Sequence, residues 1–101
     1  MTFKVERSGD RTFSVEGELD LETAPLLREM VAPTLVDSEN VMLKLDGLTF
    51  VGSDGIRAFV EFCKALGPGH VVLLNPQPQV MHVLRVTHVL RDTNLIFGYS
   101  S

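Results

Sequence analysis

Ser53 and Asp54 are the residues of this chain whose types and position best suit signalling chemistry. They lie between Gly52 and Gly55, just before an amphipathic segment that is predicted to be a helix. The first N–H groups of a helix lack intrahelical partners, and the helix dipole favours negative charge there. A serine at such a point can carry a phosphate, and an aspartate can stand in for one. Serine and aspartate are also preferred helix caps, so a purely structural role explains the same residues.

The other reactive side chains do not form a catalytic or metal-binding pattern. Ser53 has no histidine close to it in the sequence, and no nucleophile-elbow motif is present. His82 and His88 are six residues apart, a spacing that does not bring them onto one helical face, and His70 stands alone. Cys63 falls on an apolar stripe, where a packed and inert thiol is expected. We therefore expect a protein that is not an enzyme and that binds no metal or other cofactor.

Length and composition indicate one small soluble domain. The chain has 101 residues, 45% of them apolar, which is enough for a single packed core. A net charge of -4 and scattered basic residues argue against a nucleic-acid or anionic membrane surface. One cysteine rules out an internal disulfide and fits a reducing compartment. The charged N-terminal segment does not read as a secretory signal, and no stretch approaches the roughly 20 apolar residues of a membrane span. We expect a cytoplasmic protein.

The first half of the chain predicts a hairpin followed by a helix. Apolar and polar residues alternate over 3–6 and 12–17, and a Ser-Gly-Asp turn separates the two segments. Thr23 is the expected N-cap of a helix with proline in its first turn. Pro33 falls inside the helical pattern, so the helix must kink there or end early.

The second half alternates buried strands with helices. Segments 41–45 and 70–74 are more continuously apolar than the first two, which is typical of strands covered on both faces. A helix is predicted over 54–66, and a Gly-Pro-Gly sequence ends it. Residues 75–78 open a third helix, and 95–97 form either a last short strand or a helical turn. The order predicts an α/β fold with a small mixed sheet of four to five strands and helices packed mainly on one side.

Several segments in this order resemble the STAS domain of bacterial anti-sigma factor antagonists. The resemblance covers nearly the whole chain and is carried by residues 17–21, 23–28, 41–51, 73–80 and 83–87. It implies a single STAS domain over residues 1–101. It also implies a bacterial regulator of transcription, typically in a stress response. Such a regulator binds an anti-sigma factor with a serine-kinase fold, and so frees a sigma factor.

The candidate loop departs from the pattern of that family. The family loop commonly reads Asp-Ser-Ser/Thr-Gly, and the hydroxyl before the glycine accepts phosphate. In this chain Gly52 occupies the acidic position, Ser53 the first serine, Asp54 the phosphoacceptor position and Gly55 the closing glycine. Three interpretations follow. Asp54 partly imitates the phosphorylated state; Ser53 is the phosphorylation site, with its hydroxyl turned by about 100° around the helix; or Asp54 is only a cap and phosphate regulation has been lost.

The resemblance also implies where a partner binds: around this loop, the start of the following helix and the turn at Asp20. The helical pattern places Ile56, Phe59, Val60, Cys63 and Leu66 on the buried stripe and leaves Arg57, Ala58 and Phe62 beside it. Ala58 and Phe62 are four residues apart and would adjoin on the helix surface, with the aromatic ring as an anchor. The alternative is that Phe62 packs against the neighbouring helix.

Two other functions remain open on the sequence. One is that of a subunit of a larger assembly, such as the small STAS partner of a lipid-transport ATPase. STAS domains can also sense small ligands, although no unusual polar cluster in this sequence points into the expected core. The expected partner is therefore another protein rather than nucleic acid or membrane, and the chain itself is expected to be a monomer or weak homodimer.

Overall fold

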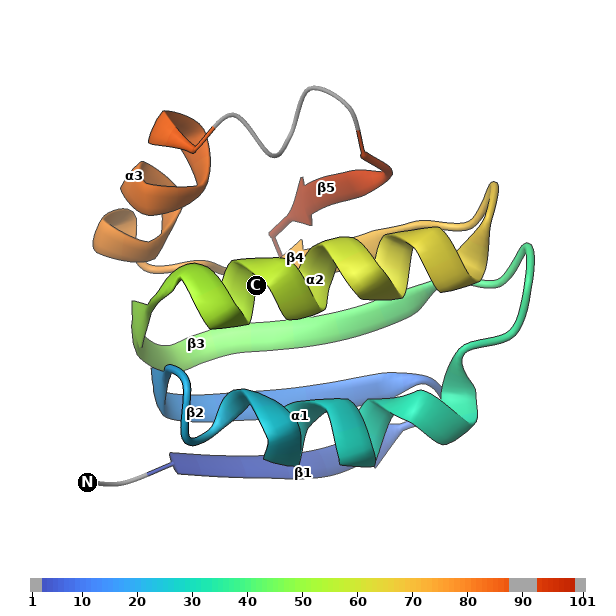
Figure 1. Ribbon diagram of the computed structural model, residues 1–101, viewed down its shortest axis with the longest axis horizontal. Helices are drawn as coiled ribbons and strands as arrows, with labels where there is room; N and C mark the ends of the chain where they lie inside the picture. Colours follow the sequence, from blue (N-terminus) through green and yellow to red (C-terminus); the bar gives the residue numbers. More distant parts are fainter. Residues whose placement is uncertain (1–2, 88–92, 100–101) are drawn as a thin grey trace.

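A computed structural model describes residues 3–87 and 93–99, and its first two strands form the predicted hairpin. β1 (Phe3–Gly9) pairs antiparallel with β2 (Thr12–Leu19). Phe13, Val15 and Leu19 on β2 are buried, so the alternating pattern marks the face turned to the core. This hairpin forms one side of the sheet (Figure 1).

The remaining strands extend the sheet in chain order. β3 (Val41–Val51), β4 (Val71–Leu74) and β5 (Leu95–Gly98) follow β2, and each pairs parallel with its predecessor. The segment that the sequence left as a strand or a helical turn is therefore the strand β5. The mixed five-stranded sheet confirms the predicted fold class.

β3 continues well beyond the predicted end at residue 45. Its pairing register with β2 shifts twice, between Ser14 and Glu16 and between Gly17 and Glu18. The alternation of buried residues shifts with it, and Asp46 is exposed. The bulged stretch breaks the simple period of two, which explains why the sequence pattern ended too early. The longer strand delivers the candidate loop to the end of the sheet. The buried residues of β3 are Val41, Leu43, Leu45, Leu48 and Val51.

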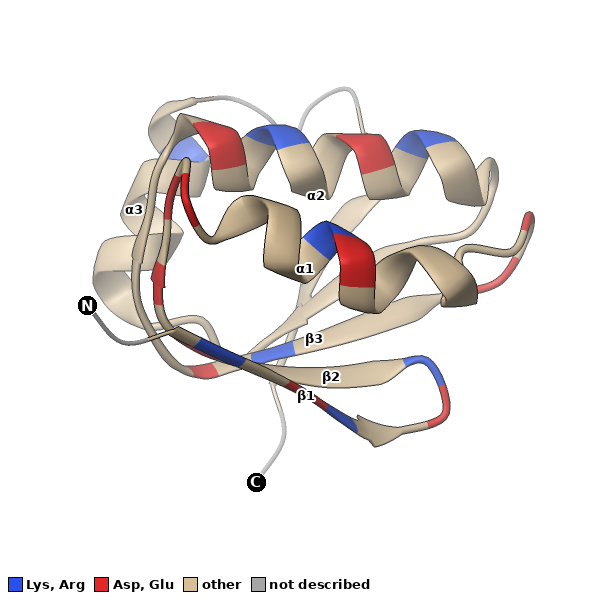
Figure 2. Cartoon of the chain, turned by 60° about the horizontal axis from the view of Figure 1, so that its bottom comes forward, with Lys and Arg blue, Asp and Glu red and all other residues tan. Residues whose placement is uncertain are grey.

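Two helices cover one face of the sheet. α1 (Ala24–Val31) and α2 (Ser53–Leu66) lie side by side on that face, as Figures 1 and 2 both show. The helical pattern around Pro33 is broken, because α1 ends at Val31 and a short 3₁₀ helix, η1 (Ala32–Thr34), follows. α3 (Pro78–Val86) packs beside the carboxyl-terminal half of β3. No helix within the described ranges is long and apolar enough to span a membrane.

Candidate partner-binding site

The carboxyl ends of β2 and β3 bring two loops together at one corner of the molecule. The N–H of Gly52 donates a hydrogen bond to the carbonyl oxygen of Leu19 over 2.8 Å. This bond joins the loop after β3 directly to the turn that follows β2. The starts of α1 and α2 lie above it, and acidic segments gather at this end of the molecule (Figure 2). The Asp20 turn and the Gly52–Gly55 loop therefore lie next to each other, as the sequence predicted.

Gly55 allows the first turn of α2 to lie against the sheet. A Cβ atom at this position would stand 2.7 Å from Leu19 Cγ and 2.9 Å from Val51 Cγ2. Both distances are shorter than ordinary van der Waals contact, so any side chain would push the helix away. The glycine therefore fixes how far Ser53 and Asp54 stand from the two strand ends.

Ser53 and Asp54 occupy the first turn of α2, as the sequence predicts. Ser53 is exposed, and the Asp54 side chain is 28% exposed to solvent. Asp54 Oδ1 lies 3.7 Å from Arg57 Nη1, one helical turn further on. Gly52 is the N-cap, and no side chain bonds the cap. Asp54 therefore supports the helix start through its charge near the positive end of the dipole, and not as an N-cap residue.

The Asp20 turn is held by a compact hydrogen-bond network. Asp20 Oδ1 accepts bonds from the N–H groups of Glu22 at 3.0 Å and Thr23 at 3.1 Å. The buried Thr23 hydroxyl lies 2.8 Å from the Glu18 carbonyl oxygen, to which it donates, and accepts the Asp20 N–H at 2.9 Å. Thr23 is the N-cap of α1, as expected, but its side chain bonds the preceding turn and not the helix. The turn is therefore rigidly positioned beside the loop.

The structure corrects the predicted surface of α2 at two positions. Ala58 is completely buried and Phe62 is 2% exposed, so neither lies beside the core on an open helix face. α2 packs on the sheet and also against α1, and Arg28 Nε reaches Glu61 Oε1 across the two helices at 2.8 Å. Because α2 is covered by both the sheet and α1, it buries residues on two sides and not on one apolar stripe alone. The burial of Phe62 agrees with the alternative in which it packs against the neighbouring helix. Val60, which was expected on the buried stripe, is only half-buried.

Two exposed apolar side chains at the corner were missed by the sequence analysis. Leu21, directly after Asp20, is 71% exposed, and Phe50, two residues before Gly52, is 48% exposed. The ring of Phe50 lies near Gly52, because a Cβ there would stand 3.4 Å from Phe50 Cε2. The available signal was a leucine inside a polar turn, which no packing pattern required. These two residues replace Ala58 and Phe62 as accessible apolar groups.

This corner presents several kinds of chemical group. It combines carboxylates, one guanidinium, one hydroxyl and two exposed apolar groups. Across residues 3–87 and 93–99, no cluster of three or more His, Cys, Asp or Glu side chains could hold a metal ion.

Comparison with known proteins identifies the domain. A family model described as STAS domain matches residues 3–97. The anti-sigma factor antagonist SpoIIAA in its unphosphorylated form superposes with a TM-score of 0.69 at 20% identity, covering 96% of this chain and 88% of that one. The phosphorylated form of SpoIIAA, a cell fate determinant of Bacillus, gives 0.64 at 20% identity, with 96% and 91% covered.

A further solved structure supports the same fold. An anti-sigma-factor antagonist (STAS) domain protein from Planctomyces limnophilus superposes with a TM-score of 0.62 at 21% identity, covering 98% of this chain and 90% of that one. At such identities the superpositions establish the fold. No curated protein matches the chain in sequence.

Proposed function

Because the chain belongs to the STAS domain family, we propose that it is an anti-sigma factor antagonist. In this role it binds an anti-sigma factor that has an ATP-binding serine-kinase fold, and so releases a sigma factor for transcription. Its part is to bind and not to catalyse. The fold of solved antagonists and an exposed corner built from two loops support this role.

The observation that carries the proposal is the carboxylate of Asp54 in the first turn of α2. By the resemblance to the family motif it takes the place of a phosphate-accepting hydroxyl, and its side chain is partly exposed. A carboxylate has one negative charge, whereas phosphoserine has about 1.5 to 2 and a third oxygen. Arg57 offsets part of the aspartate charge. We infer that the protein is insensitive to inactivation by its partner kinase at this position, with an affinity between those of the two phosphorylation states.

The proposed docking surface comprises Leu21 and Phe50 together with the charged and polar residues around them. The apolar pair supplies buried contact area, and interfaces commonly depend on such central anchors. The carboxylates would meet basic groups of the partner, which favours fast association and correct orientation. The charged and polar members are Asp20, Ser53, Asp54 and Arg57, and the backbone of Gly52 and Gly55 holds the loop between them.

An Asp54→Ser variant tests this function directly. The partner is first captured from the cytoplasm of the source cell with the wild-type chain and identified by mass spectrometry. An anti-sigma factor is expected. With this partner and ATP, Asp54→Ser should take up one phosphate and then lose binding, while the wild-type chain takes up none and stays bound. The double variant Asp54→Ser/Ser53→Ala is the matched control, because it should still take up one phosphate and so locates that phosphate at residue 54.

Two outcomes would contradict the proposal. Phosphate on Ser53 of the wild-type chain would transfer the switch to that residue. Unchanged binding of Asp54→Ser, with no phosphate uptake, would remove the switch altogether. In the same assay Leu21→Ala should weaken binding by about tenfold, as expected for an anchor residue. Ile96→Ala, at an exposed apolar residue of the far edge strand β5, should have no effect.

A further inference from the structure

β1 is an edge strand whose outer side pairs with no other strand in the described sheet. It runs over Phe3–Gly9 and is bonded only to β2. Its sequence, Phe-Lys-Val-Glu-Arg-Ser-Gly, contains no proline. An edge strand of this length presents N–H and C=O groups that can extend the sheet into another chain.

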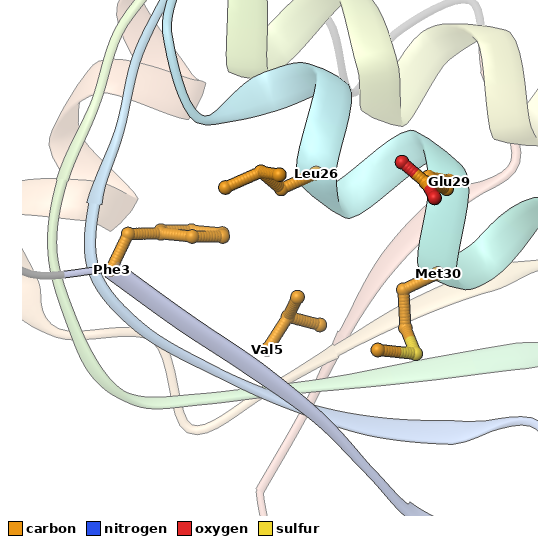
Figure 3. A pocket seen from close by; sticks show the side chains of 5 residues that line it. All are labelled: Phe3, Val5, Leu26, Glu29 and Met30. Atoms are coloured by element: carbon orange, nitrogen blue, oxygen red, sulfur yellow. The ribbon is translucent and has the colours of Figure 1, made fainter.

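An apolar groove lies directly beside this edge. It measures about 380 Å³ and is lined by Phe3 and Val5 of β1 and by Leu26, Glu29 and Met30 of α1. Figure 3 shows these side chains around the open space between strand and helix. Leu26 is 51% exposed and Met30 40% exposed. Apolar surface and unsatisfied strand edge therefore coincide on one side of the molecule.

We propose that a second copy of this chain occupies this side, by antiparallel pairing of the two β1 strands about a two-fold axis at Val5. Such an interface is isologous, so each contact occurs twice. With Val5 opposite the partner's Val5, Lys4 faces the partner's Glu6 and Glu6 faces the partner's Lys4. Opposite charges in directly opposed positions stabilise an antiparallel pair.

Charge selects this register over its neighbours. An axis at Lys4 would place Lys4 opposite the partner's Lys4, and an axis at Glu6 would place Glu6 opposite the partner's Glu6; like charges in directly opposed positions are destabilising. Moving the axis to a point between residues places the groove side of one strand beside the charged side of the other. An axis at Val5 avoids both faults. In the isolated chain Lys4 Nζ and Glu6 Oε1 are already 3.0 Å apart on the exposed side, so the dimer extends one pair into four alternating charges.

The same axis also covers the apolar groove. Both grooves would lie on the helix side of the extended sheet, because directly opposed residues share a face. α1 contacts β1, and it runs along this side of the molecule (Figure 1). The two α1 helices would therefore face each other across the joined grooves. Leu26 and Met30 of each copy would lose solvent exposure, which favours association.

Charge exchange followed by sedimentation equilibrium tests the proposal. The wild-type chain is expected to be a reversible dimer, and Glu6→Lys alone or Lys4→Glu alone should each raise the dissociation constant about tenfold. An equimolar mixture of the two variants should recover wild-type affinity, because each Lys then faces a Glu across the interface. Glu39→Lys, the same charge change on an exposed loop residue, is the matched control and should leave the dissociation constant unchanged.

Three results would overturn the proposal. One is a wild-type chain that stays monomeric up to about 1 mM, the weak end of specific association. Another is a dimer that neither charge variant weakens, because it would use a different face. The last is a mixture that dimerises no better than its components. Leu26→Gln on α1 provides an independent arm, since it should weaken the dimer without altering β1. Thermal unfolding by circular dichroism verifies that every variant is folded.

Discussion

At the scale of single residues, the two carboxylates of the corner have different surroundings. Asp20 accepts hydrogen bonds from two backbone N–H groups and thereby shapes the turn before α1. Asp54 forms a long ion pair with the exposed Arg57, and such pairs contribute at most about 1 kcal/mol. The first carboxylate therefore serves the fold, whereas the second is available for recognition.

Substitution of Asp20 separates its acceptor role from its charge. Asp20→Asn keeps an oxygen that can accept both N–H groups and should lower stability only slightly. Asp20→Ala leaves those groups without their partner and should cost about 1–2 kcal/mol, as loss of a cap does. Urea unfolding monitored by circular dichroism measures both effects. If Asp20→Ala proves as stable as Asp20→Asn, the hydrogen bonds do not hold the turn.

The affinity of the same variants for the partner is the second measurement. Asp20→Asn removes the charge but not the turn, so weaker binding by this variant would identify the carboxylate itself as a contact. Equal binding by Asp20→Asn and the wild-type chain would limit Asp20 to a structural role. The isothermal titration is made at one salt concentration, because exposed charges are screened by ions.

The sequence located part of this site and failed on the rest for identifiable reasons. Ser53 and Asp54 lie where predicted, since helix starts have strong local signals. Ala58 and Phe62 were misplaced because helical periodicity describes one buried face, and the cover provided by α1 is a tertiary contact. The exposure of Leu21 and Phe50 could not be predicted either, because it also depends on which surfaces the other helices and strands cover.

At the scale of elements, the position of α2 depends on its close approach to two strands. Gly55 is the contact point, with Leu19 of β2 and Val51 of β3 beneath it. Gly52, three residues earlier, is the N-cap and has an ordinary φ of -97°. A Cβ atom added at Gly52 would come no closer than 3.4 Å to any neighbouring atom, which is ordinary van der Waals contact. A side chain can therefore be accommodated at Gly52 but not at Gly55.

Alanine substitutions at the two positions should therefore differ in their effect on the free energy of unfolding. Gly55→Ala should lower the free energy of unfolding by about 1–3 kcal/mol through overpacking, despite the better helix propensity of alanine. Gly52→Ala should cost less, about 0.5–1 kcal/mol, because alanine is a poorer N-cap than glycine but would meet no close contact here. Chemical denaturation of both variants provides the comparison. A Gly55→Ala chain as stable as the wild type would show that the helix can move away at no cost.

The elements themselves were predicted well where the signal is local. The hairpin, the break at Pro33 and the three helices follow from alternation, proline geometry and turn residues. The length of β3 was underestimated, because its register shifts arise from pairing with β2 and leave no fixed period in the sequence. β5 was ambiguous for a related reason, since a four-residue apolar run becomes a strand only beside β4.

At the scale of the whole molecule, both α1 and α2 lie on one face of the sheet, and the core is concentrated there. Cys63 of α2 is buried in this layer with 5% exposure. Burial raises the pKa of its thiol above the ordinary value. The single cysteine therefore reports on opening of the packed layer between α2 and the sheet.

Thiol reactivity and pH should reveal this burial. Alkylation of Cys63 at pH 8 should be at least tenfold slower in the folded chain than in urea, because reaction requires opening of the core. The raised pKa means that the unfolded chain loses the thiol proton first. Its contribution to stability is thus complete below about pH 8.5, the unfolded thiol value, and is lost as the pH rises through the folded pKa.

The control for the pH effect is Cys63→Ala, which has no thiol to titrate. Between pH 7 and pH 10 its free energy of unfolding should fall less than that of the wild-type chain. Parallel pH dependence of the two proteins would mean that the thiol ionises equally in the folded and unfolded states. Urea titrations at both pH values supply the comparison.

The bond between Gly52 and Leu19 is made entirely by main-chain atoms. A main-chain hydrogen bond of this kind does not depend on which side chains the loop carries. Hydroxyl, amide or carboxylate can be exchanged at Ser53 and Asp54 while the corner keeps its shape. Under the proposed function, a regulatory input could thus be gained or discarded by replacing one residue, without rebuilding the surface that the partner would contact.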